Sequence, residues 1–107
     1  MKKKKDNIEQ RPQTALTEEN SVFIGTKPVM AYIMACVTHF NQGEEVIVLK
    51  ARGQAISRAV DVAEVLRHRF MKDLLEVTNI QLDTEQIERT EGTLSNVSAI
   101  EITLTKI

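Results

Sequence analysis

Basic side chains follow two short apolar runs of the chain, and their chemistry suits phosphate binding. Lys27 comes after residues 21–24, Arg52 comes after residues 46–49, and Arg58 lies about one helical turn beyond Arg52. Lysine and arginine carry full positive charges, and the guanidinium fork of arginine matches the geometry of a phosphate. These residues predict an anion-binding surface. Ordinary solvated charges are the alternative, because surface lysine and arginine are common.

The distribution of charge places such a surface in the middle of the chain. The sequence has 107 residues and a formal net charge of −1. Residues 1–20 hold five basic against four acidic side chains, residues 21–70 hold six against four, and residues 71–107 hold three against seven. An anion is therefore expected to bind residues 21–70 rather than the C-terminal third.

Other reactive residue types do not form a site that points to metal or cofactor chemistry. The single cysteine, Cys36, lies in an apolar segment and is expected to be a buried structural thiol. His39 and His68 have no cysteine or histidine at metal-ligand spacing, so no metal is expected. The motif Arg52-Gly53-Gln54 has one glycine and lacks the pattern of a nucleotide-binding loop, so no cofactor is expected either.

Two functions of other classes stay open as alternatives. An enzyme would use Ser57 and Asp61, one turn apart near the basic residues, but Ser57 has no neighbouring histidine and Asp61 is more simply a partner for Arg58. No catalytic residue is therefore assigned. A protein–protein adaptor would use Phe70, which lies at the end of an apolar stripe and is equally expected to be part of the core.

The N-terminal residues 1–20 are polar, contain the lysine run Lys2–Lys5, and are predicted to form a flexible tail. No apolar segment follows the lysines, so a secretory signal is not expected and a cytoplasmic location is the default. No apolar run approaches the roughly 20 residues that span a bilayer, so no membrane partner is expected.

The ordered domain is expected to cover residues 21–107 and to alternate strands with helices. Residues 21–24 read as a strand, and Pro28 is expected to begin a helix that ends at Asn41-Gln42-Gly43. The continuous apolar run 46–49 predicts a central strand covered on both faces. Two sets of apolar residues at helical spacing, one before and one after this run, predict two helices. They are Val29, Ile33, Cys36, Val37 and Phe40 in the first helix, and Ile56, Ala59, Val60, Ala63, Leu66 and Phe70 in the second.

Two alternating segments complete the chain, near residues 75–82 and 97–104. The polar residues 83–96 between them contain Gly92, which permits a turn, so a hairpin with long strand extensions is expected to project as an arm. A disordered loop is the alternative. The predicted fold is a two-layer α/β domain in the order strand–helix–strand–helix–strand–strand, with a four-stranded mixed sheet and a protruding hairpin.

This fold brings the basic residues together. Residues 25–28 and 50–54 both connect the carboxyl end of a strand to the N-terminus of a helix, and neighbouring parallel strands end at the same edge of a sheet. Helix N-termini add partial positive charge and N–H donors for phosphate.

The two connections and their flanks form two motifs. They are Ile24-Gly25-Thr26-Lys27-Pro28-Val29-Met30 and Lys50-Ala51-Arg52-Gly53-Gln54-Ala55-Ile56-Ser57-Arg58-Ala59-Val60-Asp61. Together they resemble the Alba family of archaeal chromatin proteins. The resemblance extends over residues 21–107, and helix residues 64–70 and the closing residues 100–102 are also similar.

The resemblance implies a chromosome-associated homodimer that coats or compacts double-stranded DNA, and often binds RNA, with little sequence preference. It implies nucleic-acid contacts at one set of residues and dimer–dimer contacts at Arg69 and Phe70. The implied nucleic-acid-binding residues are Thr26, Lys27, Arg52, Gln54, Arg58 and, on the arm, Arg89.

Three departures from the family pattern imply weaker or more selective binding. Thr26 stands where many members have a second lysine that is acetylated, and Gln54 stands where arginine is frequent. The arm carries four acidic residues against Arg89 alone. They are Asp83, Glu85, Glu88 and Glu91. Each lost phosphate contact weakens binding and lowers its dependence on salt. A role in RNA metabolism is the alternative within nucleic-acid binding.

Overall fold

The computed structural model of this chain describes residues 20–107. The predicted tail of residues 1–20 therefore lies outside the described residues, except for Asn20. The side chain of Asn20 is buried, and its Nδ2 donates a hydrogen bond to the carbonyl oxygen of Val46 at 3.2 Å. Asn20 is thus part of the folded domain, one residue before its expected start.

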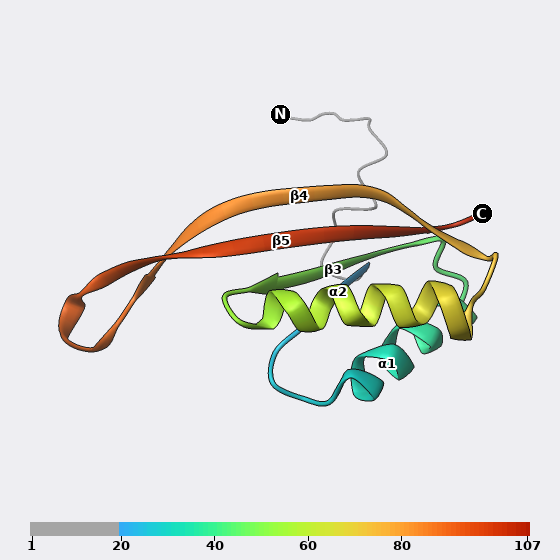
Figure 1. The fold of residues 1–107 in the computed structure, drawn as a ribbon, viewed down its shortest axis with the longest axis horizontal. Helices are drawn as coiled ribbons and strands as arrows, with labels where there is room; N and C mark the ends of the chain where they lie inside the picture. The colour runs from blue at the N-terminus through green and yellow to red at the C-terminus, as the bar shows by residue number, and fades with distance from the viewer. Residues whose placement is uncertain (1–19) are drawn as a thin grey trace.

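The elements follow the predicted order of strands and helices (Figure 1). Both loop connections of interest lie where they were expected, after the first and second strands. The elements are β2 (Ser21–Phe23), α1 (Val29–Asn41), β3 (Val46–Arg52), α2 (Ala55–Val65), η3 (Leu66–Phe70), β4 (Leu75–Glu88), η4 (Thr90–Gly92) and β5 (Leu94–Lys106).

The four strands form one mixed sheet in the order β2-β3-β5-β4. β2 pairs with β3 in parallel, and β3 and β4 pair with β5 in antiparallel orientation. Both helices lie on one face of this sheet, and the β4–β5 hairpin extends beyond them (Figure 1). The predicted two-layer α/β fold with a protruding arm is confirmed.

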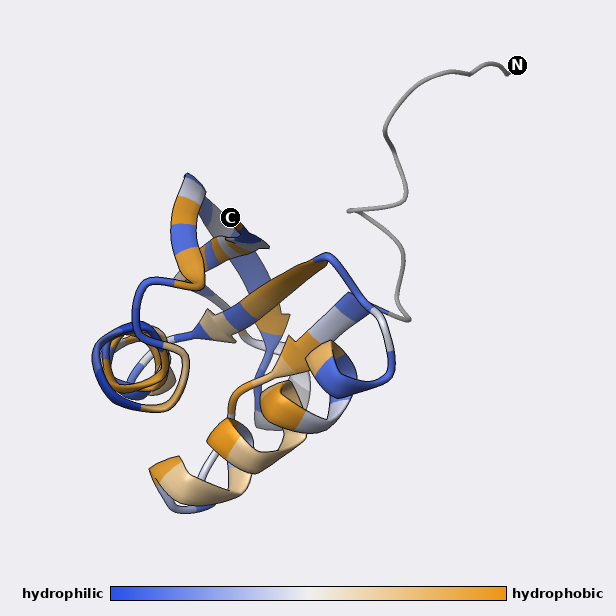
Figure 2. Ribbon diagram, turned by 90° about the vertical axis from the view of Figure 1, so that its right-hand side faces the viewer, coloured by the Kyte–Doolittle hydropathy of each residue, from blue (hydrophilic) through white to orange (hydrophobic). Residues whose placement is uncertain are grey.

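The core lies between the helices and the sheet. In α1 the predicted Ile33, Cys36 and Phe40 are buried, and Val29 and Val37 are partly buried against the core. Tyr32, which was not predicted, is buried as well. The ribbon of α1 is coloured mostly as hydrophobic, whereas α2 alternates hydrophobic and hydrophilic residues (Figure 2). No helix within residues 20–107 is long and apolar enough to cross a membrane.

Cys36 is a buried thiol, as predicted. Its side chain is fully covered by the core, and this burial raises the pKa of Cys36 to about 12, because the thiolate is poorly solvated there. The thiol is therefore protonated at neutral pH and behaves as a small apolar side chain.

The two faces of strand β3 are covered differently. Ile47 and Leu49 point into the core beneath the helices, but neither α1 nor α2 covers the opposite face, here called the open face (Figure 2). Val48 is nevertheless only 1% exposed although it lies outside the core cluster. Residues 47–49 of the apolar run are buried on both faces, as predicted, although both crossover helices pack on the same side of the sheet.

The apolar stripe of α2 was also partly mispredicted. Val60 is 42% exposed and Phe70 is 46% exposed, whereas Val62, which was not included, is fully buried. The helix packs through Ala59, Val62, Ala63 and Leu66, so its buried face is rotated away from Val60. Beyond Leu66 the backbone widens into the π-helix η3, which takes Phe70 out of the helical spacing on which the prediction relied.

The arm, which we define as the β4–β5 hairpin beyond Thr78, is a regular antiparallel ladder that runs from the pair Asn79–Thr103 to the pair Glu88–Leu94. The predicted hairpin is therefore confirmed, and its strands reach further into residues 83–96 than the apolar pattern indicated. A β-bulge at Thr78 changes the register between Val77 and Asn79. Beyond it, Ile80 and Leu82 lie opposite the core-facing Ile102 and Ile100, and the intervening odd-numbered residues lie on the open face.

Candidate nucleic-acid interface

The loop between β2 and α1 is held by the hydroxyl of Tyr32. The backbone N–H groups of Gly25 and Lys27 both donate to this oxygen, at 2.8 and 3.1 Å. Tyr32 is itself buried in α1, so its position is fixed by the core. The side chains of Thr26 and Lys27 therefore project into solvent from a loop whose backbone is tied to the folded domain.

Arg58 of α2 connects the second basic region to this loop. Its Nη1 donates to the carbonyl oxygen of Gly25 at 2.7 Å, and the Arg58 side chain is half-buried. The expected pairing with Asp61 does not appear among the interactions of Arg58 with residues 20–107. Arg58 thus ties the first turn of α2 to the β2–α1 loop and adds a charge there.

The turn between β3 and α2 depends on Gly53. Its φ of 59° lies in the left-handed region that glycine enters without strain, and its N–H donates to the Ser98 carbonyl at 2.8 Å. Arg52 and Gln54 on either side are exposed. Within the described chain, neither α1 nor α2 has a side-chain N-cap or an acidic residue in its first turn, so the partial positive charge of both N-termini is not offset there.

Two of the basic side chains near this edge are already paired with carboxylates. Arg52 Nη1 lies 3.1 Å from Glu85 Oε1 on β4, and Lys50 Nζ lies 3.8 Å from Glu101 Oε2 on β5. Lys27 has no carboxylate partner within residues 20–107. Fewer positive charges in this region are therefore available to an anion than the number of basic residues suggests.

These contacts surround a groove on the open face of the sheet. It has a volume of about 420 Å³ and is lined by Arg52, Glu85, Lys50 and the exposed ring of Phe23, among others. Lys50 Nζ stands 5.7 Å from the centre of the Phe23 ring. The groove thus joins the end of β3 to the base of the arm.

The predicted site residues separate into three places. The first is the loop edge, which we define as Thr26, Lys27, Arg52, Gln54 and Arg58. Arg89 lies at the far end of the arm, between β4 and η4, and is exposed (Figure 1). Arg69 and Phe70 lie in η3 at the opposite end of α2, and both are exposed.

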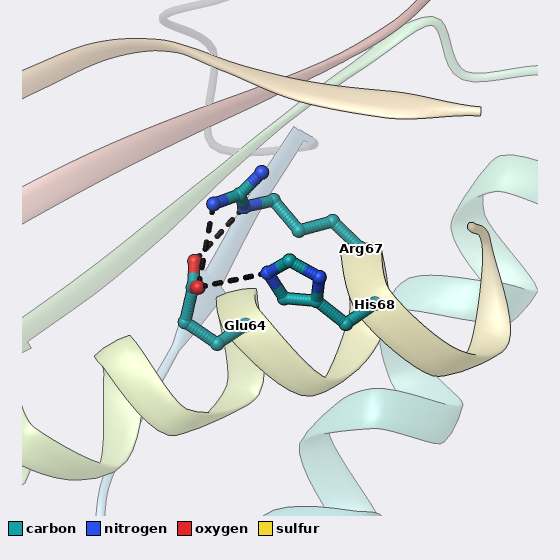
Figure 3. Close-up of polar contacts among 3 residues, drawn as sticks. All are labelled: Glu64, Arg67 and His68. Atoms are coloured by element: carbon teal, nitrogen blue, oxygen red, sulfur yellow. Dashed lines mark hydrogen bonds and ion pairs between the residues drawn. The ribbon is translucent and has the colours of Figure 1, made fainter. Parts of the chain in front are cut away.

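The region around η3 has its own polar cluster, which Figure 3 shows. Glu64 accepts from Nε and Nη2 of Arg67 at 2.9 and 3.3 Å, and lies 3.1 Å from Nε2 of His68. The hydrogen bond from Arg67 is the main cause that lowers the pKa of Glu64 below its ordinary value of 4.5. The Met71 N–H donates to the Leu66 carbonyl at 2.7 Å. This hydrogen bond joins residues five positions apart, the spacing that is characteristic of a π-helix.

Sequence reasoning missed two residues that contact the loop edge or its backbone. Tyr32 was absent from the expected core, although a tyrosine at a helical position near a turn has a hydroxyl that needs a partner when buried. The pairing of Glu85 with Arg52 had no local signal, because 33 residues separate them. The groups proposed for an enzyme, Ser57 and Asp61, are both exposed on α2.

Comparison with known proteins identifies the family. The Alba family model matches residues 20–84, which include both basic loops. The chain belongs to the Alba family. A protein named DNA/RNA-binding protein Alba, from Methanocella arvoryzae, is 53% identical over 89 residues, which cover 83% of this chain and 92% of that protein. The DNA/RNA-binding protein Alba 1 of Archaeoglobus fulgidus is 58% identical over 88 residues, 82% of this chain and 97% of that protein.

Solved Alba structures have the same fold. Alba from Thermoplasma volcanium superimposes with a TM-score of 0.76 at 51% identity, covering 80% of this chain and 99% of its own. An Alba protein of Trypanosoma brucei gives a TM-score of 0.65 at 26% identity, covering 91% of this chain and 72% of its own. The family assignment from the two loop motifs is thus confirmed by sequence and by structure.

Proposed function

We propose that this chain binds double-stranded DNA, and also RNA, by contacts of the loop edge with backbone phosphates. The observation that carries the proposal is the convergence of two strand-to-helix loops at one edge of the sheet, where Arg58 of α2 donates a hydrogen bond to Gly25 of the β2–α1 loop. Lys27 and Arg52 add full charges beside two uncapped helix N-termini, a combination that suits phosphate oxygens. The names of the relatives as DNA/RNA-binding proteins support this assignment.

Within this proposal the chain is a non-enzymatic chromatin protein in the cytoplasm, associated with the chromosome. Thr26, Gln54 and Arg89 would add polar or charged contacts along the nucleic acid. Binding is weaker or more selective than in strongly basic relatives, because carboxylates already neutralise part of the basic surface.

We also propose that the protein acts as a homodimer. Three large apolar side chains on the arm, Ile80, Leu82 and Leu94, are 58%, 75% and 58% exposed. They share the side of the sheet that the helices cover elsewhere, so a second copy that packed there would remove them from water. Changing Leu82 to Glu is expected to shift the mass measured by light scattering from dimer to monomer without unfolding the domain.

The phosphate contacts are tested by measuring affinity for labelled duplex DNA over a series of salt concentrations. Each contact removed lowers the slope of log K against log salt by about 0.9 for duplex DNA. Lys27→Ala and Arg52→Ala are expected to lower the slope by up to that amount, whereas Lys72→Ala, an exposed lysine between η3 and β4, leaves it unchanged. Failure of the wild type to bind either duplex DNA or RNA at low salt would refute the proposal.

The same titration with structured RNA separates the two roles within nucleic-acid binding. Affinity for RNA that exceeds affinity for duplex DNA at equal salt would assign the protein to RNA metabolism. Equal or tighter binding to duplex DNA supports the role in coating or compacting the chromosome.

A further inference from the structure

The ion pair between Arg52 and Glu85 connects the loop edge to the arm across an intervening strand. Arg52 lies opposite Ala99 of β5, and Ala99 lies opposite Asp83 of β4. Glu85 is one step further along the open face of β4. The small, buried side chain of Ala99 allows the two long side chains to meet above it, at 3.1 Å between Nη1 and Oε1.

Glu85, rather than the nearer Asp83, is the partner of Arg52. Asp83 Oδ1 accepts the backbone N–H of Thr84 at 2.8 Å, which commits this shorter carboxylate to its own strand. Glu85 has one more methylene group and reaches the guanidinium. The arm thus presents one carboxylate at the position that a phosphate oxygen would take on Arg52.

This pair is well placed to exchange. The side chains of Arg52 and Glu85 are 60% and 47% exposed, so water solvates both and the pair adds little to stability. A phosphate offers Arg52 a bidentate anion of the same charge type. When a phosphate binds Arg52 in place of Glu85, the Glu85 carboxylate loses its partner. It stays close to the phosphate, and the two negative charges repel each other.

We propose that Glu85 is an intramolecular competitor of nucleic-acid phosphate for Arg52, and so sets the affinity of the loop edge. This inference rests on the proposed function, since it concerns the same arginine. Glu85 occupies the Nη1 donor of Arg52, so a phosphate that uses this donor displaces Glu85. The acidic arm therefore acts through one defined contact in addition to its general charge.

The test is a double-mutant cycle that uses the full chain and a fluorescently labelled duplex DNA of mixed sequence. The variants are Glu85→Gln, Arg52→Ala, their combination, and Glu88→Gln alone and with Arg52→Ala. Glu88 is an exposed carboxylate further out on the same strand, so its change removes the same charge without touching the pair. Circular dichroism confirms that each variant is folded.

Glu85→Gln is expected to tighten binding roughly three- to tenfold at low salt and to steepen the salt slope by up to about 0.9, the value of one phosphate contact. Glu88→Gln is expected to have a smaller effect. In the Arg52→Ala background, the gain in DNA affinity from Glu85→Gln is expected to be no larger than the gain from Glu88→Gln, because the arginine for which Glu85 competes is gone.

Two results would overturn the inference while the proposed function stands. One is an equal gain from Glu85→Gln and Glu88→Gln in the wild-type background. The other is a gain from Glu85→Gln that persists undiminished without Arg52. Both would assign the effect of Glu85 to general repulsion. Absence of binding by the wild type and all variants would instead refute the proposed function, and this inference with it.

Discussion

The two ends of the continuous helix formed by α2 and η3 expose different side chains and have different backbone structure. At its N-terminal end, α2 starts after the Gly53 turn, and Arg58 fastens it to the β2–α1 loop through the Gly25 carbonyl. At its C-terminal end the helix widens into η3, where Phe70 is 46% exposed beside Arg69. One end holds backbone and cations in a fixed arrangement, and the other presents an aromatic ring.

This difference supports the proposal that the two ends make separate kinds of contact. Polar anchoring from the core suits recognition of phosphates, for which positions of N–H groups and charges matter. An exposed aromatic ring next to an arginine is typical of the residues that dominate protein–protein contacts. The contrast supports the proposal that the loop edge binds nucleic acid, and we extend it by proposing that η3 contacts a second dimer of this chain.

The largest expected effect concerns self-association at η3. Phe70→Ala is expected to weaken association between dimers by about 2 kcal/mol or more, or roughly 30-fold, as for a central aromatic contact. Unfolding free energy is expected to change by less than about 0.5 kcal/mol, because the ring is half-exposed. Light scattering as a function of concentration measures association. Phe23→Ala, a similarly exposed ring on the open face, is the control, and an unfolded Phe70→Ala protein would return Phe70 to the core.

The next effect concerns the anchoring of the loop edge. Tyr32→Phe removes the acceptor of the Gly25 and Lys27 N–H groups. It is expected to cost about 1–2 kcal/mol of unfolding free energy, because partly buried donors lose their partner, and to weaken DNA binding. Chemical denaturation and the salt titration measure the two effects. If stability falls while affinity is unchanged, the fixed loop is not needed for binding, which would contradict the role proposed for the N-terminal end of α2.

A smaller effect is expected for Arg58. Arg58→Ala removes one hydrogen bond to the Gly25 carbonyl and is expected to lower the unfolding free energy by about 1 kcal/mol. It also removes a charge from the loop edge, so DNA affinity falls with it. Arg69→Ala at the other end removes the same charge and is expected to leave both quantities nearly unchanged. Equal losses of affinity for the two variants would mean that net charge alone governs binding.

The smallest effect is the pH dependence of the polar cluster at η3. The pKa of Glu64 is lowered below 4.5, first by the hydrogen bond from Arg67, so ionised Glu64 favours the folded state. This contribution is present above the ordinary pKa and is lost as the pH falls through the lowered one. The difference in unfolding free energy between wild type and Glu64→Gln is therefore expected to shrink on acidification. A difference that is constant with pH would show that the charge of Glu64 does not stabilise η3.

Much of the fold was predictable because it depends on local patterns. Alternation at Ile100, Ile102 and Leu104 identified the core face of β5, and the positions of Lys27 and Arg52 after parallel strands placed them at one edge. The family motifs covered the same loops. These features need only neighbours in sequence and the rule that parallel strands end together.

The remaining features depend on contacts between distant residues. The stripe through Val60 and Phe70 assumed an unbroken α-helical repeat, and the rotation of α2 on the sheet and the widening at η3 invalidated it. The pair of Arg52 and Glu85 depends on the register of three strands, which composition does not reveal. The sequence indicated that the arm is acidic, but not that one carboxylate engages the arginine of the site.

The β-bulge at Thr78 has a consequence for how the arm tolerates insertions and deletions. The extra residue switches which side of the strand the even- and odd-numbered positions occupy, so Leu82 faces the helix side and Glu85 the open face. A slip that paired Thr78 regularly would turn over every side chain beyond it. Leu82 would then lie on the open face, away from the apolar side chain of Leu94 on β5, and Glu85 would be on the wrong side of the sheet to reach Arg52. The extra residue at Thr78 is therefore required for the pairing of Glu85 with Arg52. Insertions or deletions near Thr78 are expected to alter nucleic-acid binding and assembly together.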